Sequence, residues 1–345
     1  TSDGTTMTVT QDQARALIRR DTFNIGADTA VVIEQTAGQR ALNQILDTSA
    51  SQIMGELTAG GTIFLINPYG VVFGAGARVD VGALVASTLV PDDDMKFVER
   101  TDGEYVHDSL TWAQTGTAGL VSNAGTINAA NGAVLLGAGV RNEAGGTIDV
   151  GTGRAALLAG GTAQLALEPG RAPRVLITPN ASAIPAGASS GVSNAGAISA
   201  QGGTIELTGL LAAGLAATAV NNTGVLSAGG IAVGDDGSIS LLASGGHLHA
   251  GGTIDAGGGR VVLDSRGDIA LSAALTSGRF DVLAHNLTQT GGNVRASGRS
   301  SVAVTGDAIL DSAGNDFDVL ALDARGRASV VDADSLSVET GQDGA

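Results

Sequence analysis

The chain has 345 residues and no cysteine, with 34 acidic against 18 basic side chains and a formal net charge of −16. Only 15% of its residues are charged and 43% are hydrophobic, which excludes an intrinsically disordered acidic chain, because disorder requires low hydrophobicity together with high net charge. The acidic balance and the lack of clustered Lys and Arg exclude nucleic acid as a partner, since phosphate binding depends on basic patches.

The first 30 residues are expected to form an amino-terminal β cap. Their apolar stretches, at 7–10 and 23–25, lack the pattern that is repeated later in the chain. A solenoid needs an atypical first segment, because its first coil otherwise exposes an open sheet edge. We therefore expect a cap at 1–30, a β-helix domain at 31–270, and continuing coils at 271–345 whose rod extends beyond this sequence.

A turn signature lies at Asn67, Pro68, Tyr69 and Gly70, between two apolar runs. Asparagine at the first position bonds the following backbone, proline presets φ at the second, and glycine fits the fourth. The four residues therefore predict a type I turn that joins two strands. A structural role is the first interpretation of this turn, and recognition by a partner protein is the second.

Two regions interrupt the coil pattern, near 91–116 and 168–190. The first carries a charged run, and its segments on either side of Asp102-Gly103 predict a hairpin over 97–106 that stands off the solenoid. The second holds four of the six prolines, which cannot donate to an internal strand ladder. Because the coil pattern resumes after each region, both are expected to be excursions from one domain.

An internal repeat dominates the chain from Asn123 onward. Variants of Asn-Ala-Gly-Thr-Ile occur at 123–127, 142–148, 194–198, 222–226 and 250–254. Each unit reads as a short strand, a Gly-rich corner and a second short strand, with apolar residues at every second position. A repeat of about 20 to 30 residues with this content predicts an all-β parallel β-helix. Aliphatic columns should fill its interior, and Gly and Asn should occupy the positive-φ corners.

Several elements between residues 20 and 90 occur in an order that is typical of one family. They are Phe23-Asn24 within 22–26, Asn43 within 41–45, the segment 51–57, the Asn67–Gly70 turn, and Ala86-Ser87-Thr88 within 83–88. With them the chain resembles the amino-terminal secretion domain of filamentous-haemagglutinin-like exoproteins of the two-partner secretion pathway. The pattern is nearest to high-molecular-weight adhesins and haemopexin-binding exoproteins. It departs at Tyr69, where the family usually has Asn, and at Gln44, where it usually has Arg.

The resemblance implies a right-handed parallel β-helix that is exported through the periplasm to the cell surface or the medium. POTRA domains of a partner outer-membrane β-barrel transporter would recognise it, and the domain would seed the folding of a large adhesin-like exoprotein. Adhesion, host-cell binding or haem-protein binding would belong to a carboxy-terminal region outside this sequence. The implied domain is a monomer without catalytic residues, cofactor or metal.

A polysaccharide-acting β-helix enzyme is the alternative from a different functional class. Its carboxylates would be Asp235-Asp236 or Asp316 with Asp318, while Asp92–Asp94 is a candidate for calcium and His247 with His249 for another metal. Solvated turn acids and surface histidines are the simpler interpretation, because no third ligand or clustered base accompanies them. Direct binding of a host or haem-carrying ligand by the rod is a third alternative.

Overall fold

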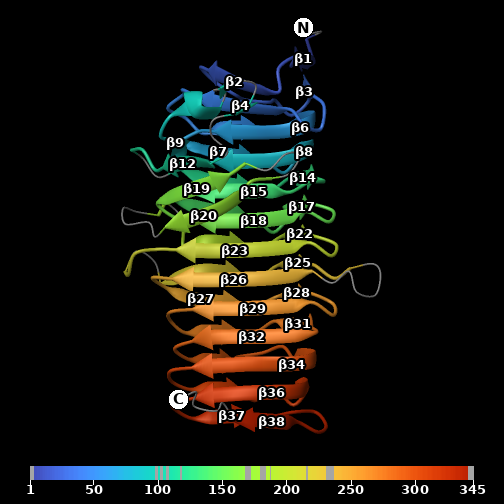
Figure 1. Ribbon diagram of the computed structural model, residues 1–345, viewed down its shortest axis with the longest axis vertical. Helices are drawn as coiled ribbons and strands as arrows, with labels where there is room; N and C mark the ends of the chain where they lie inside the picture. The colour runs from blue at the N-terminus through green and yellow to red at the C-terminus, as the bar shows by residue number, and fades with distance from the viewer. Residues whose placement is uncertain are drawn as a thin grey trace.

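The structure is a computed structural model of the chain. It describes residues 4–97, 100–101, 104–105, 109–116, 119–167, 172–178, 184–186, 188–214, 217–230 and 237–340. Figure 1 shows a rod in which the strands lie across the long axis, with the first strands at one end and the last strands at the other. Within these residues, no helix is long and apolar enough to cross a membrane.

The first face of the rod is an 11-stranded parallel sheet. Each of its strands pairs with the equivalent strand of the next coil. In order along the rod they are β5 (Ser51–Ile53), β7 (Gly70–Phe73), β13 (Leu120–Asn123), β16 (Gly139–Asn142), β21 (Ser190–Asn194), β24 (Thr218–Asn222), β27 (His247–Ala250), β30 (Ile269–Leu271), β33 (Leu287–Gln289), β35 (Ala308–Leu310) and β37 (Ala328–Val330).

The second and third faces share one 21-stranded parallel sheet. The second face contains β1 (Thr6–Thr10), β3 (Ala30–Glu34), β14 (Thr126–Ala129), β17 (Thr147–Asp149), β22 (Ala197–Ser199), β25 (Val225–Ser227), β28 (Thr253–Asp255) and β31 (Ala274–Ser277). The third contains β2 (Arg15–Arg20), β4 (Arg40–Ile45), β15 (Ala133–Gly137), β18 (Arg154–Ala159), β23 (Thr204–Leu210), β26 (Ser238–Ser244), β29 (Arg260–Ser265), β32 (Arg279–Ala284) and β38 (Ser337–Thr340). Four long strands serve both faces: β6 (Glu56–Ile66), β8 (Arg78–Ser87), β34 (Val294–Val304) and β36 (Asp316–Ala324). The predicted parallel β-helix is confirmed.

The interior of the rod is a set of stacked aliphatic columns. The isoleucines of the sequence repeat lie directly above one another, as Ile127 pairs with Ile148 and Ile148 with Ile198. The column continues through Leu226, Ile254 and Leu275, and all of these side chains are buried. Small and medium aliphatic residues therefore fill a narrow core, as the composition predicts.

The asparagines of the repeat do not take the positive-φ corners that the sequence analysis assigned to them. Asn123, Asn142, Asn194 and Asn222 are the last residues of their strands, and their side chains are fully buried. The Nδ2 atoms of the first three donate to the Oδ1 of the asparagine in the next coil, at 2.9, 2.8 and 2.7 Å. The last amide donates to the carbonyl oxygen of Gly251. We call this stack the asparagine ladder; it satisfies polar groups inside an otherwise apolar core.

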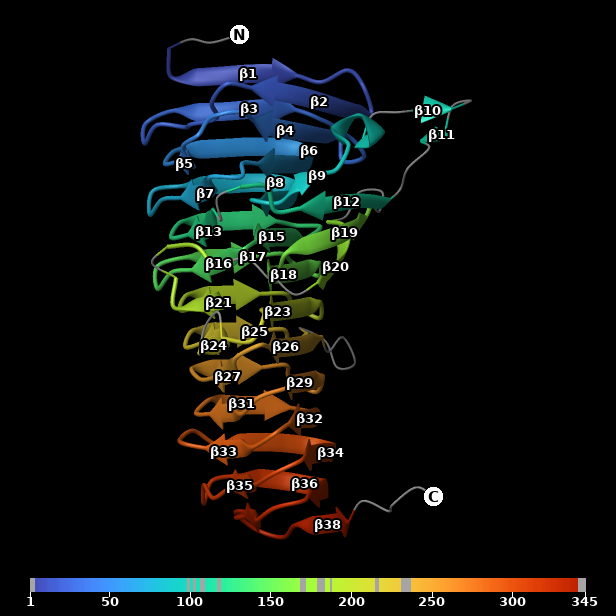
Figure 2. The same ribbon diagram turned by 90° about the vertical axis from the view of Figure 1, so that its left-hand side faces the viewer.

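An antiparallel sheet of four strands covers the third face over its first coils. We call it the sheath; its strands, in the order in which they pair, are β20 (Arg174–Thr178), β19 (Thr162–Ala166), β12 (Ser109–Ala113) and β9 (Val90–Pro91). Its inner side chains form a second core with the outward side chains of the coils beneath. Figure 2 shows the sheath strands beside the rod.

The excursion near 91–116 differs in part from the predicted hairpin. Two short antiparallel strands, β10 (Arg100–Thr101) and β11 (Glu104–Tyr105), pair where the sequence predicts the hairpin and project away from the rod in Figure 2. The predicted turn at 102–103 lies outside the described residues. Phe97 belongs to a short 3₁₀ helix, η1 (Asp94–Phe97), rather than to a hairpin strand, and its ring is fully buried.

The amino-terminal strands pair in parallel with the coil that follows, β1 with β3 and β2 with β4. Strand β2 also contacts the excursion far along the chain, because Arg19 forms an ion pair with Asp94 at 2.9 Å. The neighbouring Arg15 donates to the carbonyl oxygen of Phe97. The first strands are therefore tied to the segment that follows β8, which lies three strands further along the third face.

Candidate functional site: the corner at Asn67–Gly70

The predicted turn at Asn67–Gly70 is present between β6 and β7. The amide of Gly70 donates to the carbonyl oxygen of Asn67 at 3.0 Å, which closes the turn. The side-chain Oδ1 of Asn67 accepts from the amide of Tyr69, also at 3.0 Å. Asparagine at the first turn position thus bonds the following backbone, as expected for this residue type.

Asn67 also joins this coil to its two neighbours. Its Nδ2 donates to the carbonyl oxygen of Ser49 at 2.9 Å and to the hydroxyl of Ser51 at 3.0 Å, both in the preceding coil. Its backbone amide donates to the carbonyl oxygen of Ser87 in the following coil. Because Asn67 is fully buried, its side chain serves the fold and presents no surface to a partner.

Gly70 closes the turn in a conformation that favours glycine, with φ of 130°. A Cβ at this position would lie 3.0 Å from the Cβ of Ala50 and 3.0 Å from the carbonyl oxygen of Leu120. Gly119 approaches the turn from the next coil, and a Cβ there would collide with the carbonyl oxygen of Pro68. The turn is consequently held between two coils that leave no space for larger residues.

Tyr69 is the exposed member of the turn. Its side chain is 41% exposed, whereas Asn67 and Gly70 are buried and Pro68 is half-buried. The corner therefore separates two tasks: Asn67 holds three coils together, and the ring of Tyr69 faces solvent. Tyrosine combines a large apolar ring with a polar hydroxyl, which suits it to protein interfaces.

The 86–88 segment completes the coil that follows the turn. Ala86 is buried in the central core, and the hydroxyl of Ser87 both donates to the carbonyl oxygen of Leu89 and accepts from its amide, each at 2.9 Å. Thr88 is also buried, and its Oγ1 has no hydrogen-bond partner in the described structure. The structure thus brings Asn67 and Ser87 together and leaves Thr88 as a packing residue.

The earlier family-matching residues lie in the coils that precede this corner. Phe23 is buried in the core, and the Oδ1 of Asn24 accepts from the amide of Gln52 at 2.8 Å. Asn43 is buried on β4, where it accepts from the Nε of Arg20 at 2.9 Å. Burial lowers the pKa of Arg20 from its usual value. These contacts are structural and do not converge with the turn on one surface.

Sequence reasoning missed the two serines that hold Asn67. Ser51 lies within a segment that resembles the family, but nothing in the sequence indicates that its hydroxyl faces the turn. Ser49 acts through its backbone carbonyl, so its side-chain type carries no signal. The contact between Gly119 and the turn is easier to predict from the sequence, because a glycine before an apolar strand is often a point of close backbone approach.

The candidate acidic residues that the structure describes do not assemble into an active site. Asp92 and Asp93 are exposed on a loop, and Asp94 is paired with Arg19. Asp316 and Asp318 are exposed on β36, and the pair at 235–236 lies outside the described residues.

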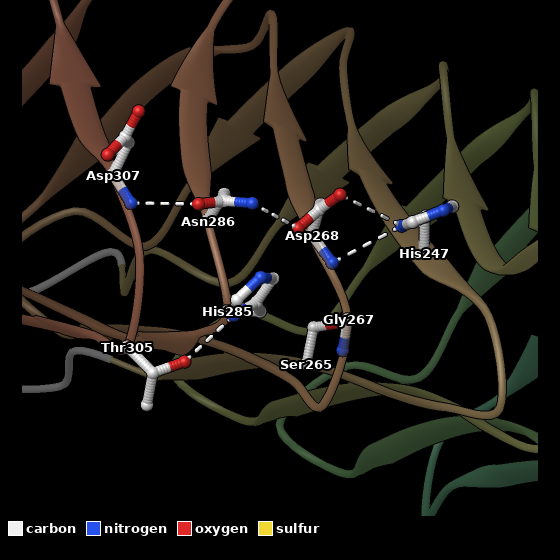
Figure 3. Close-up of polar contacts among 8 residues, drawn as sticks. All are labelled: His247, Ser265, Gly267, Asp268, His285, Asn286, Thr305 and Asp307. Carbon is white, nitrogen blue, oxygen red and sulfur yellow. Dashed lines mark hydrogen bonds and ion pairs between the residues drawn. The ribbon is translucent and has the colours of Figure 1, made fainter. Parts of the chain in front are cut away.

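The candidate histidines belong to a row of polar contacts between coils. In Figure 3, Asp268 lies between His247 and Asn286. The amide of Asp268 donates to His247 Nδ1 at 3.2 Å, and Asn286 Nδ2 donates to Asp268 Oδ1 at 2.8 Å. His249 instead contacts Asn221 and Ser272. Among the described residues, no three His, Cys, Asp or Glu side chains are placed to hold a metal ion.

Comparison with known proteins gives a consistent pattern along the chain. Residues 1–256 match the model of the TPS secretion domain, and residues 258–323 match a model described as repeats of unknown function. The crystal structure of the HMW1 secretion domain from Haemophilus influenzae superposes with a TM-score of 0.78 at 21% identity. That alignment covers 98% of this chain and 96% of the other, and at this identity it supports the fold.

Two curated relatives are heme/hemopexin-binding proteins from Haemophilus influenzae. One is 40% identical over 83 residues and the other 34% identical over 150 residues. The matches cover 24% and 42% of this chain, but only 9% and 16% of the relatives. The chain therefore corresponds to a small part of those proteins.

Proposed function

Because the chain belongs to the TPS secretion domain family of two-partner secretion exoproteins, we propose that it targets a large surface exoprotein to a dedicated partner transporter and nucleates its folding. The match of residues 1–256 to the family model carries this proposal. The transporter is an outer-membrane β-barrel with POTRA domains in the periplasm. The protein emerges at the cell surface or in the medium, and the domain acts without enzymatic chemistry.

The solenoid architecture supports the folding role. Each coil contacts mainly its neighbours, so a formed coil offers an unpaired strand edge on which the next coil can add. In this proposal the chain is divided into a cap at 1–30, the secretion domain at 31–270, and continuing coils at 271–345. Within the secretion domain, Asn67 and Ser87 fasten consecutive coils, which suits a unit that folds before the rest of the exoprotein.

Recognition by the transporter falls to the exposed part of the Asn67–Gly70 turn. The ring of Tyr69 is accessible, while Asn67 is enclosed. We therefore assign Tyr69, with Pro68 beside it, to contact with the transporter, and Asn67 and Gly70 to the geometry that presents them. Phe23, Asn24, Asn43, Ala86, Ser87 and Thr88 have structural roles in the same domain.

Secretion of the chain, with a signal peptide attached, tests the function in cells with and without the transporter encoded beside its gene. Export should require the transporter. Retention of folded protein in both strains would contradict the proposal and favour a carbohydrate-active β-helix. Folding is checked separately by circular dichroism and urea unfolding of purified protein.

Variants of the turn distinguish recognition from folding. Replacing Asn67 and Pro68 together with Ala should lower stability and secretion in parallel, because the contacts to Ser49 and Ser51 are lost. Tyr69→Ala should leave the unfolding curve unchanged and reduce secretion, with Tyr69→Phe as the matched control. A loss of stability in Tyr69→Asn would show that the ring packs against a neighbouring coil, and normal secretion of Tyr69→Ala would remove Tyr69 from recognition.

The activity of the complete exoprotein lies outside this domain in our proposal. The curated relatives are named for binding haem and haemopexin. By analogy, binding of a host-cell or haem-carrying ligand would belong to the carboxy-terminal region of an adhesin-like protein. Comparing ligand binding by the complete exoprotein and by this chain tests that assignment.

A further inference from the structure

A polar groove follows the corner between the second and third faces, next to strand β20 of the sheath. Two open cavities, of about 580 and 470 Å³, adjoin each other and share Gly202, Gly203 and Thr204. We call it the arginine groove. The polar side chains that line it include Arg154, Thr204, Ser238, Arg260 and Arg279.

Glycines form the floor of this groove for a structural reason. A Cβ at Gly203 would collide with the carbonyl oxygen of Gly153 in the preceding coil. One at Gly237 would meet Gly203 in the same way, and one at Gly259 would meet Gly237. Successive coils therefore approach too closely here for any larger residue. The groove remains open because its floor is backbone.

The polar side chains lie in one line along the rod. Arg154 pairs in register with Thr204, and the line continues through Ser238, Arg260 and Arg279 on successive strands of the third face. At the spacing between neighbouring strands, these four steps span roughly 19 Å. The line consequently presents guanidinium groups at both ends and two hydroxyl groups between them.

The arginines are held by carboxylates and still present donors. Asp281 is only 8% exposed, and its Oδ2 accepts from the Nε of Arg260 at 2.6 Å and the Nε of Arg279 at 2.7 Å. Both arginine side chains are half exposed. Arg154 is likewise oriented by an ion pair with Glu206. Arg154 also donates through Nη1 to the carbonyl oxygen of Pro173 at 3.3 Å, whereas the terminal nitrogens of Arg260 and Arg279 make no further hydrogen bond within the described residues.

The groove is locally basic in a strongly acidic chain. Three of its arginines, Arg154, Arg260 and Arg279, face two carboxylates, those of Glu206 and Asp281, whereas the whole chain carries a net charge of −16. Arginine is suited to carboxylate groups, because its planar fork of donors matches their two oxygens. The hydroxyl groups of Thr204 and Ser238 add neutral hydrogen-bonding positions between the charged ends.

We propose that the arginine groove binds a linear polysaccharide that carries carboxylate groups. A chain lying along the rod would place its carboxylates at the arginines and its ring hydroxyls against Thr204, Ser238 and the glycine backbone. A sugar chain that runs along the rod passes over successive coils, so its carboxylates meet the arginines at the two ends of the line and its hydroxyls meet Thr204 and Ser238 between them. This binding is separate from transporter recognition, which we place at Tyr69.

An acidic peptide fits the same surface less well. Peptides that bind to sheets add as a strand at a free edge and insert alternate side chains into pockets. Strands β23, β26 and β29 are paired on both sides, so they offer no edge. The glycine floor likewise provides no apolar recess for a side chain.

Isothermal titration of the 345-residue chain with hexagalacturonate at low salt tests this proposal. Controls are a neutral galactose hexamer and poly-L-glutamate of similar charge. Binding should be observed with hexagalacturonate, should be much weaker with both controls, and should weaken as salt is added, because exposed charges are screened. Replacing Arg260 and Arg279 together with Gln should reduce the affinity by about tenfold or more.

A second variant protects the test against misfolding of the arginine double variant. Ser238→Trp fills the groove from an outward position on β26 and should abolish binding. Ser240→Trp, two residues along the same strand and outside the groove, is the matched control and should bind normally. No binding of hexagalacturonate, or equal binding by Ser238→Trp, would overturn the site. Equal affinity for poly-L-glutamate would replace the polysaccharide with an acidic protein, and equal affinity for the neutral hexamer would exclude a role for charge.

Discussion

The third face of the rod changes character along its length. Under the sheath, β15 is buried at every position and β18 at all but its first. Beyond the sheath, β26 alternates between buried and half-buried side chains, and β29 alternates between buried and more exposed ones. The same face of one solenoid is therefore a two-sided core in one region and a solvent-facing surface in the other.

This difference shows what a covering layer demands of the sequence. A strand with one face in water needs apolar residues at every second position only, whereas a strand covered on both faces reads as a continuous apolar run. The run at 133–136 and the run at 155–159 thus indicate a cover, although the sheath strands come from elsewhere in the chain. The strands beyond the sheath, which we call the bare region, have continuous apolar residues only at the positions that face the core.

Trp112→Ala should produce the largest loss of stability, and it tests whether the sheath forms a second core. The side chain is fully buried, and its ring centroid lies 6.2 Å from that of Phe64. Its removal should lower the free energy of unfolding by about 3 to 5 kcal/mol, measured by circular dichroism in urea.

The matched control for Trp112 is an exposed apolar residue on the bare region. Leu283 on β32 is 56% exposed, so Leu283→Ala should change stability by less than about 0.5 kcal/mol. Similar losses in both variants would mean that the sheath does not act as a core and that the comparison between the two regions fails.

The repeated elements could be predicted from the sequence, and the sheath could not. Ile127, Ile148 and Ile198 mark each coil because every coil repeats the same local pattern. Strand β12 is recognisable by the alternation of Leu110 and Trp112, but its antiparallel partner β19 lies about 50 residues later, and no local signal specifies that pairing. At the candidate site, the turn at Asn67 follows from its residue types. The contact with the carbonyl oxygen of Ser49 depends on how two coils stack.

Asn194→Ala should cause a loss of stability smaller than that of Trp112→Ala. It tests the interior of the rod, which the covered and uncovered regions share. The asparagine ladder passes from coils under the sheath to coils beyond it, and Asn194 accepts from Asn142 and donates to Asn222. Its loss leaves both neighbours short of a buried partner, which should cost about 2 to 4 kcal/mol in urea unfolding.

The neighbouring Asn221 provides the control for the ladder. It bonds His249 at a half-buried position outside the core, so Asn221→Ala should cost less than about 1 kcal/mol. Equal effects of the two substitutions would show that the ladder contributes no more than a surface contact.

Asp264→Asn should give the smallest effect and tests how exposed the bare region is. Asp264 lies on β29 between Leu242 and Leu283 in register, and burial raises the pKa of its carboxyl, partly offset by Arg266. A raised pKa means that the folded state favours the neutral acid. The contribution of Asp264 to stability is therefore complete below the ordinary pKa of aspartate, and it is lost as the pH rises through the pKa that Asp264 has in the folded protein.

The asparagine variant should therefore be more stable than the unmodified protein near neutral pH, by less than about 1 kcal/mol because solvent screens a half-buried group. The difference should disappear as the pH falls below that ordinary pKa, where both forms are neutral. Urea unfolding across this range measures it, with exposed Asp316→Asn as the control for total charge. A gain that stays constant with pH would assign the effect to packing between the leucines, and the bare face would then be less hydrated than its alternating pattern indicates.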